Sequence, residues 1–370
     1  MILVIDCFKQ VKGVGKSIGI YNLVFNLIRS LAEERARTKS NVINYSKIIV
    51  LGNEYNRSDF DIDGVDFVSV RHNPLNKLIC IVWELFLVSK VCKKLKADRV
   101  LFPRGFCALT HPVKDSIIIH DLIPFYYDKH YHDFFNKLEN AYIMSRMKSS
   151  IKFCNQVITI SEASKKEILD IVKVNIGKIV MIHNGCNAIL NIHKTYMDKP
   201  YIIAITSNLP HKNAESVIKS YIEYYETARK PIDLKIIGIS DVEEYGIPKE
   251  IKAHITCFKF IEEDQEFYRI VGNGSIFLFL SLIEGFGFPP IEGMQLGVPV
   301  VCSNLSSLPE VVGDAAMLVN PFNHKEVGQT LDILLSDSEK QKLLIEKGYQ
   351  NIARFSWESR AKLYWEALIK

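Results

Sequence analysis

Two glutamates, Glu284 and Glu292, flank a stretch whose composition suits neither a regular helix nor a strand. They enclose the segment GFGFPPI. Glycine lets a bulky ligand approach the backbone closely, and Pro289 and Pro290 suit the first turn of a helix. The free N–H groups of such a turn favour an anion such as a diphosphate, while carboxylates accept hydrogen bonds from hydroxyls. The combination predicts a nucleotide-sugar site. The alternative is that Glu284 caps a turn and Glu292 only complements the helix dipole.

The elements around these glutamates place them at one edge of a sheet. The apolar run Ser275–Ile283 predicts a strand buried on both faces, so Glu284 follows the carboxyl end of that strand. In open α/β sheets ligands bind at this edge. Lys212 follows another predicted strand, Tyr201–Thr206, and precedes a helix that begins near Ala214. A lysine at a helix N-terminus suits a diphosphate leaving group, although a surface lysine beside a helix cap would give the same pattern.

The segment from Glu284 to Met294 resembles the E-x7-E signature of retaining glycosyltransferases with the GT-B fold. The resemblance continues through Gly297–Val301 and Ser306–Ala315 and is weaker elsewhere. It implies catalytic roles for Glu284, Lys212 and His120. It also implies a set of donor-binding residues, namely Glu292, Gly285, Phe286, Gly287, Phe288, Pro289, His211, Gly15 and Gly19. Glu284 would bind hydroxyls of the transferred sugar and Glu292 those of the ribose.

His120 and Asp121 follow another predicted strand, Ser116–Ile119. A histidine at this edge can donate to a sugar hydroxyl or a phosphate, with Asp121 orienting its ring. A turn or cap would explain the same pair. The resemblance implies that His120 lies near the transferred sugar.

Two sites depart from the family pattern. The loop Lys12–Gly19 imitates a phosphate-binding P-loop, but the first required glycine is replaced by Gln10. The resemblance implies instead a glycine-rich segment near the donor phosphates and acceptor, in which Ser17 stands where the family has glycine. His211 stands where the family has arginine, so we hypothesise that leaving-group stabilisation is weaker or pH-sensitive.

Apolar runs predict strands along the whole chain, with helices between them, and this alternation predicts an α/β fold. The predicted strands are Ile2–Asp6, Lys47–Leu51, Val65–Val70, Val100–Phe102, Ser116–Ile119, Gln156–Ile160, Lys178–Ile182, Tyr201–Thr206, Leu234–Ile237, His254–Phe258, Ser275–Ile283 and Val300–Cys302. The resemblance makes this fold GT-B, with two Rossmann-like doubly wound parallel sheets facing each other across a cleft. We expect an acceptor-side domain over 1–196 and a nucleotide-sugar-binding domain over 197–355. The C-terminal helix, 356–370, is expected to cross back to the first domain.

Composition describes a globular chain and gives its two halves opposite charge. Residues 1–196 contain 28 Lys and Arg against 18 Asp and Glu, a balance of +10, whereas the rest has a balance of −6. The apolar segment Leu78–Cys92, followed by lysines up to Lys96, predicts either a core helix or contact with an anionic membrane. The scattered cysteines indicate reduced thiols, and no signal peptide or membrane span is evident. We expect a cytoplasmic protein that contacts the inner face of the membrane.

The expected reaction is retaining transfer of a sugar from a nucleoside-diphosphate donor to a glycan or lipid-linked acceptor, in bacterial surface polysaccharide or lipopolysaccharide synthesis. No cofactor or metal is expected, because Asp59–Gly64 lacks the glutamate and helices of a calcium loop and predicts a solvated turn. A GT-B sugar phosphorylase and a non-catalytic sugar- or nucleic-acid-binding protein are the alternatives. Sparse aromatic and arginine interleaving argues against nucleic acid as a partner.

Overall fold

The computed structural model describes residues 1–13, 18–37, 47–111, 113–189 and 199–369 of the 370-residue chain. The chain divides into two compact units. The first contains Met1–Gly185 and Phe355–Lys370, and the second contains Cys186–Arg354. The structure therefore divides the chain after Gly185, earlier than the predicted boundary at residue 196, which lies outside the described residues.

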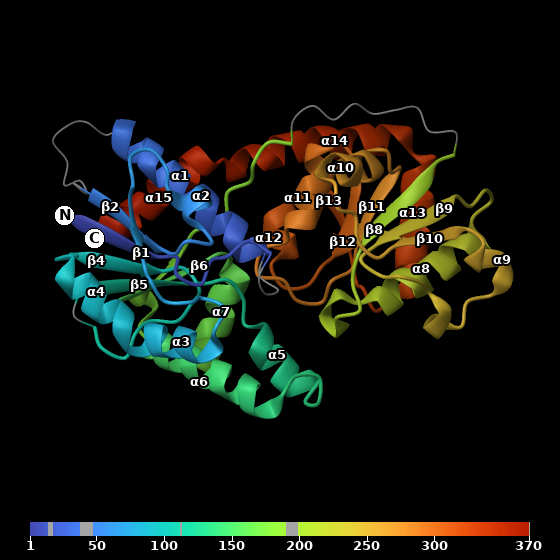
Figure 1. Cartoon of the computed structure of the whole chain (residues 1–370). Coiled ribbons are helices and arrows are strands. Elements are labelled where there is room, and N and C mark those ends of the chain that lie inside the picture. Colours follow the sequence, from blue (N-terminus) through green and yellow to red (C-terminus); the bar gives the residue numbers. More distant parts are fainter. Residues whose placement is uncertain (14–17, 38–46, 112, 190–198, 370) are drawn as a thin grey trace. The chain divides into compact units, whose positions relative to one another are not determined.

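The first unit is built on a seven-stranded parallel sheet of order β3-β2-β1-β4-β5-β6-β7 (Figure 1). Its strands are β1 (Ile2–Asp6), β2 (Lys47–Gly52), β3 (Asp66–Ser69), β4 (Arg99–Phe102), β5 (Lys114–Ile119), β6 (Gln156–Thr159) and β7 (Ile179–Met181). All seven were predicted, with ends that differ by no more than two residues. Apolar residues fill the central strands, which is expected of a sheet covered by helices on both faces.

The helices of the first unit lie on both faces of this sheet. They are α1 (Ile18–Arg37), α2 (Arg57–Phe60), α3 (Lys77–Val82), α4 (Val88–Lys94), α5 (Ile123–His130), α6 (Lys137–Phe153), α7 (Glu162–Ile171) and α15 (Trp357–Ile369). Helices α1 and α15 lie on one side, and α3, α6 and α7 on the other (Figure 1). Asp59–Gly64, predicted as a solvated turn between strands, forms the end of α2 and an exposed turn before β3, although Phe60 is buried.

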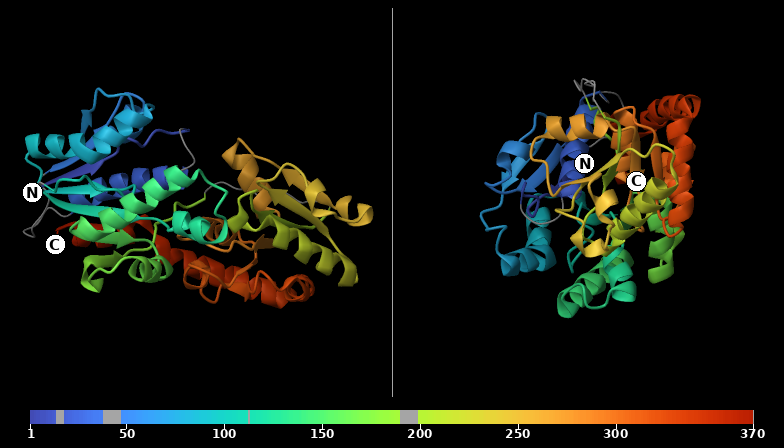
Figure 2. Two further views of the ribbon diagram at one scale, coloured as in Figure 1. Left: turned by 90° about the horizontal axis from the view of Figure 1, so that it is seen from below. Right: turned by 90° about the vertical axis from the view of Figure 1, so that its right-hand side faces the viewer.

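The C-terminal helix α15 belongs to the first unit, where it packs against α1 (Figure 2). Arg37 pairs with Glu358 at 2.7 Å, and the Trp357 ring lies so close to Gly185 that a Cβ there would stand 2.3 Å from it. Ser356 accepts a hydrogen bond from the Ser359 N–H, as expected of a helix cap. The C-terminal part of the chain thus completes the covering of the first sheet.

The second unit contains a six-stranded parallel sheet of order β10-β9-β8-β11-β12-β13. Its strands are β8 (Tyr201–Ile205), β9 (Asp233–Ile237), β10 (Ile255–Phe258), β11 (Ile276–Phe279), β12 (Val300–Ser303) and β13 (Ala316–Val319). Its helices are α8 (Ala214–Thr227), α9 (Lys249–Lys252), α10 (Asp264–Gly272), α11 (Phe288–Gln295), α12 (Leu308–Val312), α13 (His324–Ser336) and α14 (Ser338–Ile352). Helix α13 packs on α8 and α14 packs on α11. The strand order reverses between β8 and β11, which is the arrangement of a Rossmann-like sheet.

Two elements were not predicted. Strand β13 is a half-exposed edge strand whose four residues, AMLV, are all apolar but form too short a run to be told from part of a helix. A π-helical turn, Trp83–Leu87, interrupts the helix predicted over Leu78–Cys92. The turn buries Glu84, whose carboxylate pairs with Lys9 at 3.0 Å and faces Arg146 at 3.7 Å.

Candidate active site

Two loops meet at the point where the strand order of the second sheet reverses. Strands β8 and β11 are parallel neighbours, with Ile202 opposite Ile276. The loop after β8 contains Lys212, and the loop after β11 contains Glu284. In sheets of this topology the crevice outside the carboxyl ends of two such strands is where ligands bind. The predicted lysine and glutamate therefore lie at the edge that the topology favours for a ligand.

The side chains of Lys212 and Glu284 form an ion pair in which Nζ and Oε1 lie 2.5 Å apart. The side chain of Lys212 keeps 24% of its surface exposed and that of Glu284 keeps 12%. The ammonium group also lies 5.7 Å from the centre of the Phe279 ring. A partly desolvated pair of this kind keeps a cation and a hydroxyl acceptor within reach of one ligand.

The backbones of the two loops are hydrogen-bonded to each other. The carbonyl of His211 accepts from the Leu282 N–H at 2.8 Å and from the Ser281 hydroxyl at 3.1 Å. Asn213, which adopts a left-handed conformation at the start of α8, donates its side-chain amide to the Leu280 carbonyl at 3.0 Å. Because several bonds join the loops, the distance between Lys212 and Glu284 is set by the fold rather than by one flexible side chain.

Ser306 and Ser307 hold the Glu284 loop from a third direction. The Glu284 N–H donates to the Ser306 hydroxyl at 3.1 Å, and the Ser307 hydroxyl donates to the carbonyls of Glu284 and Phe286 at 3.0 and 2.7 Å. Sequence reasoning assigned these serines no role. Their position a few residues after the predicted strand Val300–Cys302 could have identified them, because that strand also ends at this edge of the sheet.

The segment from Gly285 to Pro289 forms the entry to α11, as predicted. Gly287 caps the helix with a φ of +112°, and Pro289 lies in its first turn. The positive φ favours glycine, and a Cβ on Gly287 would also stand 2.7 Å from a methyl group of Leu308 and displace it. The Phe286 side chain is buried at 2% exposure and packs edge-on to Phe288. Phe286 can therefore contact a ligand only through its backbone.

Glu292 lies on α11 with its carboxylate partly buried. Burial, together with the negative charge of Asp264 on α10, raises the pKa of Glu292 to about 7. No side chain or backbone group among the described residues hydrogen-bonds this carboxylate. The Glu292 carboxylate is therefore about half ionised near neutral pH. Hydroxyl groups of a ligand that donate hydrogen bonds to it would stabilise its ionised form.

Replacing Glu292 by glutamine is expected to stabilise the unliganded protein in a pH-dependent way. The pKa of Glu292 is higher in the folded protein than in the unfolded chain. The free energy of unfolding therefore falls as the pH rises from about 4.5 to 7, and the full loss is present above pH 7. E292Q should therefore raise the free energy of unfolding by about 1–3 kcal/mol at pH 8 and have little effect at pH 4. Denaturant unfolding at both pH values measures this. The control is E346Q, at an exposed position on α14; a destabilised E292Q at pH 8 would contradict the prediction.

His211 lies beside this pair but is not positively charged near neutral pH. Its side chain is 4% exposed, and burial, assisted by the positive charge of Lys212, lowers its pKa to about 4. A neutral imidazole can donate a hydrogen bond to a diphosphate but does not supply the second positive charge that an arginine would. Lys212 is therefore the cation that these two loops place beside Glu284.

His120 lies in the first unit, directly after β5. Its Nε2 donates to the Pro103 carbonyl at 2.6 Å, which leaves Nδ1 as the acceptor nitrogen. Burial lowers the pKa of His120 to about 4, so the ring is neutral. One oxygen of Asp121 accepts from the Ile123 N–H at 3.1 Å, in the turn that begins α5. His120 thus has a fixed orientation at the carboxyl edge of the first sheet, and its role toward a sugar stays a prediction.

The glycines of the first loop are only partly described. Gly15 lies outside the described residues. Gly19 lies in the first turn of α1 and is exposed, with open space where a Cβ would be. Its proximity to donor phosphates stays a prediction.

Two family models match the chain in succession. Residues 22–188 match a model described as Glycosyltransferase Family 4, and residues 187–351 match Glycosyl transferases group 1. Among curated proteins, the O-antigen chain mannosyltransferase RfbU of Salmonella typhimurium is 27% identical over 68% of this chain and 69% of its own length. The O-antigen chain mannosyltransferase B of Escherichia coli is 25% identical over 59% of this chain and 61% of its own length, which is less than two thirds of that relative.

Solved structures show the same fold over the whole chain. Sucrose-phosphate synthase from Thermosynechococcus elongatus aligns with a TM-score of 0.71 at 15% identity, covering 99% of this chain and 98% of its own. WaaG, a glycosyltransferase of lipopolysaccharide biosynthesis, aligns with a TM-score of 0.68 at 12% identity and 99% coverage of both chains. The predicted GT-B fold, with two Rossmann-like parallel-sheet domains, is thereby confirmed. The chain belongs to the group 1, family 4 glycosyltransferases and is distantly related to O-antigen mannosyltransferases.

Proposed function

We propose that this glycosyltransferase transfers a sugar from a nucleoside-diphosphate donor, with retention at the anomeric carbon, to a glycan or lipid-linked acceptor. The proposed setting is bacterial surface polysaccharide or lipopolysaccharide synthesis, in line with the mannosyltransferases that resemble the chain. The observation that supports it best is the ion pair of Lys212 and Glu284, at the reversal point of the second sheet. A diphosphate needs a cation and a sugar needs hydroxyl acceptors, and this pair supplies both.

The proposed division of roles follows from the chemistry of each group. Lys212 and the N–H groups of Phe288 and Ile291 at the start of α11, where Pro289 and Pro290 have none, stabilise the negative charge that develops on the departing diphosphate in the transition state. Glu284 accepts from hydroxyls of the transferred sugar, and Glu292 from those of the ribose. The backbone from Gly285 to Pro289 lines the sugar and phosphate. His120 contacts the sugar, and no metal is required for the leaving group.

A donor screen tests the proposal. The full-length protein is heated with UDP-, GDP-, ADP- and dTDP-sugars, and its melting temperature is recorded. A donor that binds only the folded state stabilises it by about 2.7 kcal/mol at one hundred times its Kd. A HepE protein of Anabaena has been solved with UDP-glucose, which makes UDP-sugars a natural first set. Stabilisation by at least one donor class is expected, and its absence with all four would contradict a nucleotide-sugar function.

Turnover assays with the donor found in this screen distinguish a transferase from a phosphorylase. Donor turnover that depends on inorganic phosphate and yields a sugar phosphate would favour a phosphorylase. Turnover that depends on an acceptor glycan, with the anomeric configuration of the donor preserved in the product by NMR, would support the proposed reaction.

We further propose that the first unit touches an anionic membrane through an apolar face on α3, the π-helical turn and α6. Lys77 and Glu139 lie 3.8 Å apart, so the starts of α3 and α6 are neighbours. The large apolar side chains exposed on these elements are Leu78, Val82, Phe86, Leu138 and Tyr142, with Leu78 at 73% and Leu138 at 84%. Exposed lysines on α4, Lys90, Lys93 and Lys94, complement negative lipid. No described helix has the length and apolarity needed to cross a bilayer.

Changing Leu78 and Phe86 together to serine is expected to weaken binding to vesicles containing phosphatidylglycerol at least ~10-fold, because each buried apolar side chain contributes about 1.5–3 kcal/mol. Co-sedimentation measures the bound fraction. The matched control is F260S, since Phe260 is 72% exposed but lies in the second unit. Equal loss in F260S, or equal binding of the wild type to neutral vesicles, would contradict an anionic membrane face.

A further inference from the structure

We propose that Cys107, His111 and Asp115 form a zinc site in the first unit, separate from the donor site. One ligand atom from each residue lies within 4.8 Å of the other two. The set combines a thiol sulfur, an imidazole nitrogen and a carboxylate oxygen, all ligands that zinc takes. Calcium and magnesium prefer oxygen ligands alone, so the sulfur and nitrogen favour zinc over both.

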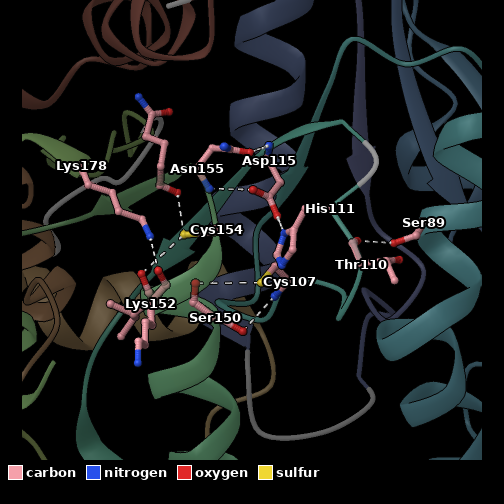
Figure 3. Close-up of polar contacts among 12 residues, drawn as sticks. Ser89, Cys107, Thr110, His111, Asp115, Ser150, Lys152, Cys154, Asn155 and Lys178 are labelled. Carbon is pink, nitrogen blue, oxygen red and sulfur yellow. Dashed lines mark hydrogen bonds and ion pairs between the residues drawn. The ribbon is translucent and has the colours of Figure 1, made fainter. Parts of the chain in front are cut away.

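The local chain positions these three residues closely. Cys107 and His111 lie in the loop between β4 and β5, and Asp115 is the second residue of β5. Cys107 and Asp115 are each only 2% exposed, whereas His111 lies at the surface. Figure 3 shows the three side chains next to one another. The buried thiol and carboxylate thus form the floor of the cluster, and the imidazole covers it from the solvent side.

Hydrogen bonds from α6 and its C-terminal end hold the two buried residues. The Asn155 N–H donates to Asp115 Oδ1 at 2.7 Å, which leaves Oδ2 facing His111 Nδ1 at 2.6 Å. The Cys107 N–H donates to the Ser150 hydroxyl at 3.1 Å, and Arg146 donates to the Cys107 carbonyl at 2.6 Å (Figure 3 shows all but Arg146). Metal ligands are usually oriented by a surrounding shell of this kind.

Binding requires small changes in the positions of the exposed imidazole and of the buried thiol. In tetrahedral zinc geometry neighbouring ligand atoms lie roughly 3.4–3.6 Å apart. The imidazole would move slightly away from Asp115 and the sulfur would approach it. Rotation of the His111 ring, on the solvent side of a loop, provides the first movement, and rotation of the Cys107 side chain, whose sulfur lies 4.0 Å from the Ser150 carbonyl, provides the second. Water would complete the coordination at the exposed position.

The cluster lies at the opposite end of β5 from His120. Asp115 and His120 are separated along the strand by roughly 16 Å, given about 3.3 Å per residue. The ion would therefore fasten the loop between β4 and β5 rather than take part in sugar transfer. That loop begins at Pro103, whose carbonyl orients His120, so the metal would stabilise the support of that ring.

The test uses the full-length protein and two metals. After equilibration with zinc and removal of the excess, we expect one retained equivalent by elemental analysis and a higher melting temperature. With cobalt in its place, a thiolate-to-cobalt charge-transfer band is expected. C107S should lose the band, and H111A and D115N should retain at least ~10-fold less metal. D115N keeps an acceptor for the Asn155 N–H, which limits structural damage.

The matched control is C257S, a partly buried cysteine of the second unit, which should keep the band and the metal. If the wild type neither retains zinc nor shows the cobalt band, the proposed zinc site is wrong. This outcome is measured on the wild type alone, so it does not depend on whether any variant folds. An unchanged band in C107S would also overturn it. Neither readout depends on donor binding. A negative metal result therefore leaves the proposed transferase function unaffected, and a negative donor screen leaves the proposed zinc site unaffected.

Discussion

Replacing Lys212 by alanine is expected to lower the rate constant for sugar transfer about 10²–10³-fold while the protein stays folded. Lys212 is the cation placed at the switch point of the second sheet, and removing one group that stabilises developing negative charge typically has an effect of this size. The leaving diphosphate would then depend on backbone N–H groups and on His211, which is neutral near pH 7. Steady-state kinetics with the donor found by the screen measures the loss.

The control for this variant is K219A on α8. Lys219 also pairs with a glutamate, Glu215 at 2.6 Å, but both side chains are more than half exposed. Such surface pairs contribute about 0–1 kcal/mol, so K219A should be close to wild type in rate and stability. A K212A rate within threefold of the wild-type rate would contradict the role assigned to this lysine.

The second large effect is expected for Glu284→Gln, which should lower kcat/KM for the donor about 10²-fold. Glutamine preserves the shape of the side chain but replaces a charged hydroxyl acceptor by a neutral one, and hydrogen bonds to charged groups are worth about 1.5–3 kcal/mol. The change also removes the charge partner of Lys212, whose side chain is three-quarters buried. The loss should therefore appear in both kcat and KM.

E215Q is the matched control, since it neutralises the glutamate of the surface pair. Circular dichroism and melting temperature separate loss of activity from loss of fold. An E284Q protein that folds and keeps wild-type kcat/KM would show that the Glu284 carboxylate only pairs with Lys212 and does not bind the sugar.

The sequence predicted the sheets well because their strands are buried on both faces. Runs such as IFLF in β11 are apolar throughout and contain bulky residues that favour strands, which is typical of a strand covered on both faces. The edge strand β13 was missed because its apolar run, AMLV, is too short to distinguish a strand from part of a helix. The π-helical turn was missed because it depends on burying Glu84 against Lys9 and Arg146. Both features are decided by tertiary contacts that periodicity does not reveal.

The candidate site was predicted in its residues but not in its electrostatics. Strand alternation placed Lys212 and Glu284 at the same edge, but their direct pairing requires β8 and β11 to be neighbours, which only the strand order shows. The low pKa of His211 and the high pKa of Glu292 arise from burial and from charges on other elements. The zinc cluster escaped notice because Cys107 was grouped with the other scattered thiols.

The most direct test of the central claim is calorimetric titration of the wild type, K212A and E284Q with the nucleoside diphosphate and with its sugar. If Lys212 holds the diphosphate and Glu284 the sugar, K212A loses affinity for both ligands. E284Q should then keep its affinity for the diphosphate and lose only the extra affinity that the sugar provides. Equal affinities of all three proteins for both ligands would contradict the account.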